Sequence, residues 1–210
     1  MIQQNLWLLW LVCMPVSVYA GTDIDAAERD TIKFIKVHFL YGSKPKKEFK
    51  FLEKKWFGGM HGGHVSIETD SVVTGFGPKG KFHVFGHRKN FHSHFFSQGM
   101  PEWMDDSVGM KYVTVTIPLT WVQYQRIDSI HKAYQNTPPY DYAFVGMRCA
   151  AATYDILSQL KLVSNRGRFG MVTRYFYPKL LRKRILKLAA ERKYVIHQQS
   201  GRITRKWEKD

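Results

Sequence analysis

The sequence has little cysteine: only Cys13 and Cys149 in 210 residues. Residues 6–20 form an uncharged, mostly apolar run that ends in small side chains, as an export signal does. The run is shorter than the roughly 20 apolar residues that span a bilayer. We therefore predict that residues 1–20 are a signal peptide and that the protein is periplasmic or secreted, with an uncleaved membrane anchor or a buried hydrophobic strand as the alternatives. Cleavage would leave Cys149 alone, which excludes an intramolecular disulfide.

Acidic residues are also scarce, with 17 Asp and Glu against 32 Lys and Arg. The imbalance is concentrated in residues 161–210, which carry 15 basic and three acidic residues. Export makes nucleic acid an unexpected partner, whereas an anionic membrane surface fits the charge.

A helix is predicted to begin at Pro178 and to run to about residue 193. Its leucine stripe, Leu181, Ile185 and Leu188, is flanked by basic residues. That pattern suits a helix lying on an anionic membrane. It equally suits a helix that packs on the domain through its leucines, with its charges in solvent.

No internal repeat is visible, and helical and strand patterns alternate along the chain. The sequence predicts helices over 22–41, 120–133 and 149–160, strands over 64–69, 72–74, 81–85 and 111–117, and a surface loop over 87–106. These elements indicate an α+β fold with a small antiparallel sheet packed on helices, followed by a basic C-terminal helix.

Cys149 stands where the last of these helices is expected to begin. A thiol at a helix N-terminus faces unsatisfied N–H groups and the positive end of the helix dipole, which both stabilise the thiolate. Arg148 adds a neighbouring positive charge. We expect Cys149 to be a nucleophile, although a free cysteine is often only a small buried apolar residue.

His64 opens a predicted strand directly after Gly62 and Gly63. A strand holds an imidazole rigidly, and a thiolate nucleophile needs a histidine that takes its proton and later protonates the leaving group. His64 is the candidate for that base, and a polar residue at a strand end is the simpler interpretation.

The segments Gly63-His64-Val65-Ser66-Ile67 and Pro139-Tyr140-Asp141-Tyr142 … Arg148-Cys149-Ala150-Ala151 resemble the circularly permuted NlpC/P60 papain-like proteins. The YiiX-like and lecithin:retinol acyltransferase-like families belong to that group. The resemblance covers roughly residues 58–162 and implies a papain-like domain over 21–170, with 171–210 as a basic extension. It implies that Cys149 is the nucleophile, His64 the base, and Tyr140 a residue that binds the substrate or the oxyanion.

The resemblance also implies a third residue that orients His64 from the following strand, near Phe76 or Gly77. Neither of these can form a hydrogen bond through its side chain. His83 on the next strand is the favoured candidate. Glu68 is less suitable, because it lies about 13 Å along the strand from His64. A Cys-His pair without a third member is the other possibility.

Four histidines, His83, His87, His92 and His94, gather in the predicted loop region. Such spacings can bind zinc, but neither a cysteine nor a nearby acid completes a known ligand pattern. We expect no metal and no cofactor.

The sequence thus predicts an exported cysteine hydrolase or acyltransferase. It would act on an amide or ester bond of a peptide, peptidoglycan or lipid, through an acyl-thioester on Cys149. The alternative is a catalytically inactive papain-like module that binds an anionic surface.

Overall fold

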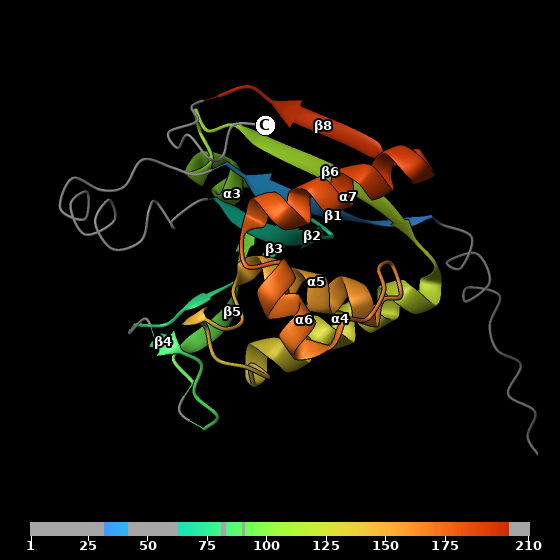
Figure 1. Cartoon of the computed structure of the whole chain (residues 1–210). Helices are drawn as coiled ribbons and strands as arrows, with labels where there is room; N and C mark the ends of the chain where they lie inside the picture. The colour runs from blue at the N-terminus through green and yellow to red at the C-terminus, as the bar shows by residue number, and fades with distance from the viewer. Residues whose placement is uncertain (1–31, 42–62, 81–82, 90, 202–210) are drawn as a thin grey trace, which may run out of the picture. The chain divides into compact units, whose positions relative to one another are not determined.

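Six antiparallel strands form one sheet in the order β5-β3-β2-β1-β6-β8 (Figure 1). The computed structural model describes residues 32–41, 63–80, 83–89 and 91–201. The predicted signal peptide and Cys13 lie outside these residues. The strands are β1 (Lys33–Leu40), β2 (His64–Thr69), β3 (Val72–Pro78), β4 (His83–Phe85), β5 (Ser93–Gly99), β6 (Tyr112–Leu119), β7 (Ala143–Val145) and β8 (Val195–Gln199). The helices are α3 (Met100–Asp106), α4 (Trp121–Asn136), α5 (Cys149–Gln159), α6 (Gly167–Arg174) and α7 (Pro178–Arg192). The α+β fold class is confirmed.

β1 corrects the expectation of a helix over 22–41, as far as the structure describes that segment. Ile35, Val37 and Phe39 are completely buried and alternate along the strand, which places them on one face of the sheet. β1 is hydrogen-bonded to β2 on one side and to β6 on the other. The helical spacing of Ile35 and Phe39 misled the prediction, because a short apolar run fits both periods.

The expected loop over 87–106 is also corrected, since it contains β5 and α3. β5 pairs with β3 along its whole length. α3 begins with Pro101 in its first turn and buries Trp103 in a small cluster with Val73 and Tyr112. These elements escaped prediction because β5 buries a serine, Ser93, and places Phe95 and Phe96 side by side, which obscures its alternation.

The main core lies between the sheet and the helices α4, α5, α6 and α7. It joins apolar side chains of the sheet to those of the helices, including Ile127 of α4, Leu157 of α5 and Met171 of α6. The predicted helix starts at Thr120 and Cys149 are confirmed, and Thr120 forms a capping box with Gln123. α5 packs on β2 and β3, so the core fixes its first residue near the beginning of β2.

The basic C-terminal segment is part of the fold. Leu181, Ile185 and Leu188 of α7 are buried in the main core, as expected for a helix that packs on the domain. β8 pairs with β6 and extends the sheet by one strand. Within the described residues, none of the helices has the length and apolar character needed to cross a membrane.

Of the predicted strand over 81–85, the described residues form β4, which does not join the main sheet. It pairs in parallel with β7, with His83 opposite Ala143 and Phe85 opposite Val145. In Figure 1, β4 lies at the lower left, well away from β8 and α3.

Candidate functional site

Cys149 is the first residue of α5, and its side chain is buried, with 4% of the residue exposed. Arg148, the residue before it, is extended and gives no side-chain cap to the helix. The N–H groups of the first turn therefore remain open to another acceptor near the thiol. The predicted placement of Cys149 at a helix N-terminus is confirmed.

The pKa of Cys149 is lowered from its ordinary value by a balance of opposing effects. Burial is the largest effect and raises the pKa, because it penalises the charged thiolate. A hydrogen bond from His64 and the charge of that imidazole outweigh it, with help from Arg148 and a hydrogen bond from the backbone of Val65. His64 and Cys149, which lie far apart in the sequence, are thus neighbours in the fold.

His64 is held by its backbone and by one aromatic neighbour. Gly63 has a φ of 78°, a left-handed conformation that glycine adopts without strain, and it leads directly into β2. The imidazole stacks on Phe96 of β5, with 5.6 Å between ring centroids. Its Nε2 atom is buried and has no hydrogen-bond partner among the described residues. We therefore assign the hydrogen bond with the thiol to the other ring nitrogen, Nδ1.

Gly75 of β3 occupies the place next to Nε2 of His64. A Cβ atom at position 75 would lie 2.7 Å from Nε2 and 2.6 Å from Cζ of Phe96. The residue that faces the imidazole from the strand after β2 is thus Gly75, not Phe76 or Gly77. Because glycine has no side chain, the site lacks an orienting hydrogen bond at this point.

The structure does not bring His83 to His64, so the expectation that His83 orients the base is corrected. Nδ1 of His83 is hydrogen-bonded to Oδ2 of Asp141 at 2.5 Å. The backbone N–H groups of His87 and His92 also donate to Asp141, at 3.0 and 2.9 Å. Pairing of β4 with β7 holds His83 at Asp141, a strand partner that the sequence pattern did not reveal.

Contacts between rings hold three histidines of the predicted cluster together. The ring of His83 stacks on that of His87, with centroids 4.0 Å apart, and meets His92 edge-on. In the part of the chain that the structure describes, no group of three or more His, Cys, Asp or Glu residues is arranged to hold a metal ion. Asp141 is the acid that the sequence analysis did not connect with this cluster.

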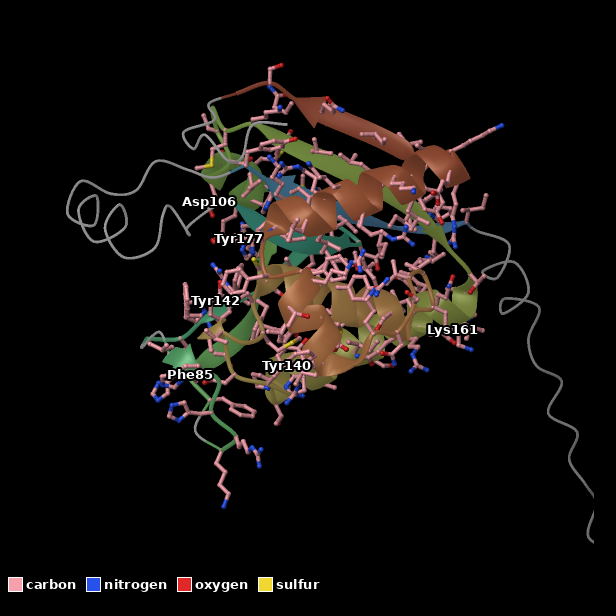
Figure 2. The ribbon with its side chains drawn as sticks, in the orientation of Figure 1. Phe85, Asp106, Tyr140, Tyr142, Lys161 and Tyr177 are labelled. Carbon is pink, nitrogen blue, oxygen red and sulfur yellow. The ribbon has the colours of Figure 1, made fainter. Side chains whose placement is uncertain are left out.

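Tyr140, which the sequence suggested as the residue that binds the substrate or the oxyanion, packs in the core, and a second tyrosine, Tyr142, lies near Cys149. The Tyr140 hydroxyl donates to Asp155 at 3.4 Å, and its ring packs against Phe76, so it belongs to the core. Burial raises the pKa of Tyr142 to about 12, and the neighbouring charge of Cys149 adds to this effect, which places this phenol beside the thiol. The two tyrosines lie apart in Figure 2, with Tyr140 nearer to α4. Tyr142, which sequence reasoning passed over, is the tyrosine beside Cys149.

Arg148 connects the site to the C-terminal part of the chain. Its guanidinium lies over the ring of Phe176, 4.7 Å from the centroid, and near that of Tyr177. It also lowers the pKa of both Cys149 and Tyr142. The segment between α6 and α7 therefore helps to position a charge of the site.

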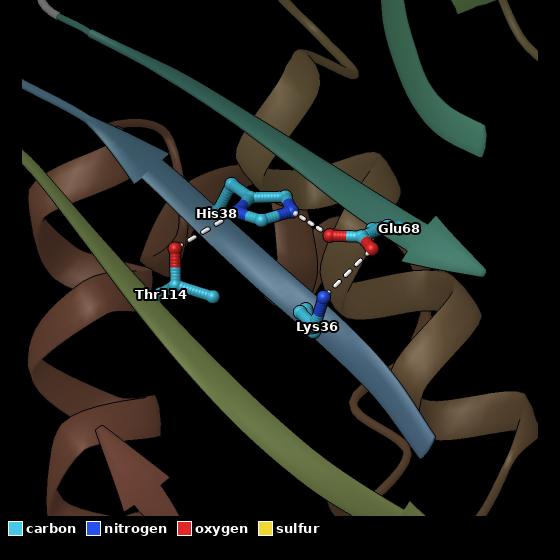
Figure 3. Close-up of polar contacts among 4 residues, drawn as sticks. All are labelled: Lys36, His38, Glu68 and Thr114. Atoms are coloured by element: carbon cyan, nitrogen blue, oxygen red, sulfur yellow. Dashed lines mark hydrogen bonds and ion pairs between the residues drawn. The ribbon is translucent and has the colours of Figure 1, made fainter. Parts of the chain in front are cut away.

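Glu68, the other candidate for orienting His64, is engaged elsewhere. Its Oε2 atom is 2.9 Å from Nε2 of His38, whose Nδ1 contacts the Thr114 hydroxyl at 2.8 Å (Figure 3). Lys36 forms an ion pair with Oε1 at 2.8 Å. Burial lowers the pKa of His38, and the charge of Glu68 opposes that effect. The chain Lys36-Glu68-His38-Thr114 ties β2, β1 and β6 together.

Comparison of the chain with protein-family models, characterised proteins and solved structures gives no match.

Proposed function

We propose that this protein is an exported papain-like cysteine enzyme of the permuted NlpC/P60 type. Its reaction would be hydrolysis or transfer at the carbonyl of an amide or ester. The observation that carries the proposal is the position of Cys149, a buried thiol beside His64 at the uncapped N-terminus of α5, where its pKa is lowered. Burial alone would raise that pKa, so the surroundings favour the thiolate against the cost of desolvation.

In the reaction, His64 takes the proton of Cys149, and the thiolate attacks the carbonyl carbon. The carbon–sulfur bond forms, and the carbonyl π electrons move to oxygen. When the oxyanion collapses, the carbon–nitrogen or carbon–oxygen bond breaks and His64 gives its proton to the leaving group. Water, or an acceptor alcohol or amine, then attacks the thioester while His64 accepts a proton. Cleavage of the carbon–sulfur bond restores the thiolate.

Two kinds of donor are available for the oxyanion. The first-turn N–H groups of α5 have no side-chain cap and belong to the same turn as the reacting sulfur. The phenol of Tyr142 keeps its proton because its pKa is raised to about 12, and it stands beside Cys149. Donors fixed in advance near a developing negative charge are the main source of stabilisation in acyl transfer.

The second candidate function is an inactive papain-like binding module. It is favoured by Gly75, which offers His64 no orienting side chain, and by the near-complete burial of Cys149. The two functions differ in one observable, the formation of a covalent acyl group on Cys149.

p-Nitrophenyl acetate tests that difference, because it transfers an acetyl group to a reactive thiolate and releases nitrophenolate. We expect one acetyl group on Cys149, located by mass spectrometry of its peptide. Release of nitrophenolate should fall by about 100-fold or more in Cys149→Ala and in His64→Ala. Within the described residues Cys149 is the free cysteine, so another thiol of the fold does not replace it in the variant. Full release in Cys149→Ala would exclude the cysteine enzyme, and an unacetylated wild-type protein would favour the binding module.

A further inference from the structure

The small sheet of β4 and β7 exposes apolar side chains that a water-soluble surface would normally cover. Val84, Phe85 and Val145 are 58%, 67% and 47% exposed. Phe85 and Val145 are register partners and therefore lie side by side on one face. Clustered exposed apolar residues mark surfaces that bind a partner or a membrane, whereas single ones do not.

Two basic residues lie close to β4 in the sequence. Arg88 and Lys89 follow β4 after Gly86 and His87, both are exposed, and neither forms an ion pair within the described residues. The sequence between Asp70 and Glu102 contains no Asp or Glu. Asp141, which contacts this segment, is buried beneath His83 and accepts two backbone N–H groups. We call Val84, Phe85, Arg88, Lys89 and Val145 the β4–β7 tip.

A short turn connects the tip to the candidate site. A β-bridge between Tyr142 and Met147 closes the turn that contains Val145. Cys149 follows Met147 two residues later in the chain. Tyr142, at the base of the turn, stands beside the thiol. A short stretch of extended chain separates Tyr142 from Val145, a reach of about 10 Å.

We propose that the β4–β7 tip docks on an anionic lipid bilayer. The apolar side chains enter the boundary between headgroups and acyl chains, and Arg88 and Lys89 contact the lipid phosphates. Interfacial segments of this composition insert by about 5–10 Å, which would hold the thiol close to the headgroups. A protein partner is a poorer fit, because a stable protein interface covers about 800 Å² on each side and the tip offers only a few apolar residues.

Docking is independent of the proposed cysteine chemistry, and a binding measurement tests it. Full-length proteins are sedimented with vesicles of phosphatidylcholine alone and with vesicles that also contain phosphatidylglycerol. Phe85→Ser/Val145→Ser removes the apolar contact, and Arg88→Gln/Lys89→Gln removes the charge. Val108→Ser/Val122→Ser is the matched control, because these valines are 70% and 72% exposed outside the tip. All the proteins keep the same basic C-terminal segment, so it contributes equally.

We expect binding to the anionic vesicles to fall about tenfold in the apolar variant. The charge variant should also bind less and should lose part of the salt dependence of binding. The control should bind like the wild type. If the apolar variant binds like the wild type, or if the control loses as much, the tip is not the docking surface. If the wild type and the apolar variant bind the vesicles equally well and also bind soluble heparin equally well, the site is instead a purely electrostatic site for a polyanion.

Discussion

Gly75 lies directly against Nε2 of His64, so close that a single added carbon at position 75 would come within 2.7 Å of that nitrogen. The imidazole is therefore positioned by stacking on Phe96 and by its contact with Cys149, and not by a hydrogen bond to a third side chain. Nε2 of His64 is buried and has no hydrogen-bond partner among the described residues, so the hydrogen bond to water that this nitrogen loses on folding is not replaced.

The first prediction concerns Gly75→Ala. The new methyl group must displace His64 or Phe96, so the alkylation of Cys149 by iodoacetamide should shift to higher pH, and the protein should lose about 1–3 kcal/mol of stability. Gly77→Ala is the matched control, because its Cβ would approach only Phe96, at 3.3 Å, and would not reach His64. An unchanged pH profile in Gly75→Ala would show that the position of His64 does not govern the thiol.

A second prediction follows from supplying the missing acceptor. In Phe96→Gln, the space of the Phe96 ring becomes available to an amide oxygen that can accept from Nε2 of His64, and no carbon is added at position 75. A partner at Nε2 favours the imidazolium, and the pKa of Cys149 should then fall by about one unit relative to Phe96→Ala. The measurement is again the pH dependence of alkylation. If Phe96→Gln is no more reactive at low pH than Phe96→Ala, an acceptor at Nε2 does not control the thiol.

The two tyrosines give a third prediction. Tyr142→Phe removes the phenol beside Cys149, so nitrophenolate release from p-nitrophenyl acetate should fall by about 10-fold or more while the protein stays folded. Tyr140→Phe removes only a hydrogen bond to Asp155 in the core and should cost about 1 kcal/mol of stability. Its catalytic rate should match that of the wild type. A larger loss of rate in Tyr140→Phe than in Tyr142→Phe would restore the role expected from the sequence.

The start of α5 was predictable because its signals are local. A run of alanines after a non-helical segment defines the helix, and Cys149 falls at its first position. His64 was predictable in the same way, as the first residue of a strand after glycines. Both are properties of a few neighbouring residues.

The remaining parts of the site depend on contacts between segments that are distant in sequence. Gly75 faces His64 only because β2 and β3 pair in a given register, and Ser66 is its direct partner. His83 meets Asp141 only because β4 pairs with β7. The choice between Tyr140 and Tyr142 depends on Asp155, which draws Tyr140 into the core. Local sequence patterns do not reveal partners that are distant in the chain. For this reason β1, β5 and the residue expected to orient His64 were predicted wrongly.

The fourth prediction is that the burial of His131 in α4 makes the stability of the protein fall at acidic pH. The side chain is buried, and its Nε2 atom has no hydrogen-bond partner within the described residues. Burial lowers its pKa from 6.5 to about 4, and the charge of Asp128 only partly opposes this. Between these two pH values the unfolded chain binds a proton that the folded protein does not. The contribution to stability is therefore complete above pH 6.5 and is lost as the pH falls toward 4, by about 3 kcal/mol in all.

His131→Leu removes that proton uptake while it keeps an apolar side chain of similar size in the core. Between pH 6.5 and 4 the free energy of unfolding, measured with urea, should decline by less in the variant than in the wild type. It should still decline, because His38 has a lowered pKa and loses stability in the same direction. His197→Leu on the exposed strand β8 is the control. Its free energy of unfolding should decline toward low pH as much as that of the wild type. If the free energy of unfolding declines equally with pH in His131→Leu and in the wild type, the folded protein binds a proton at His131 as readily as the unfolded chain does.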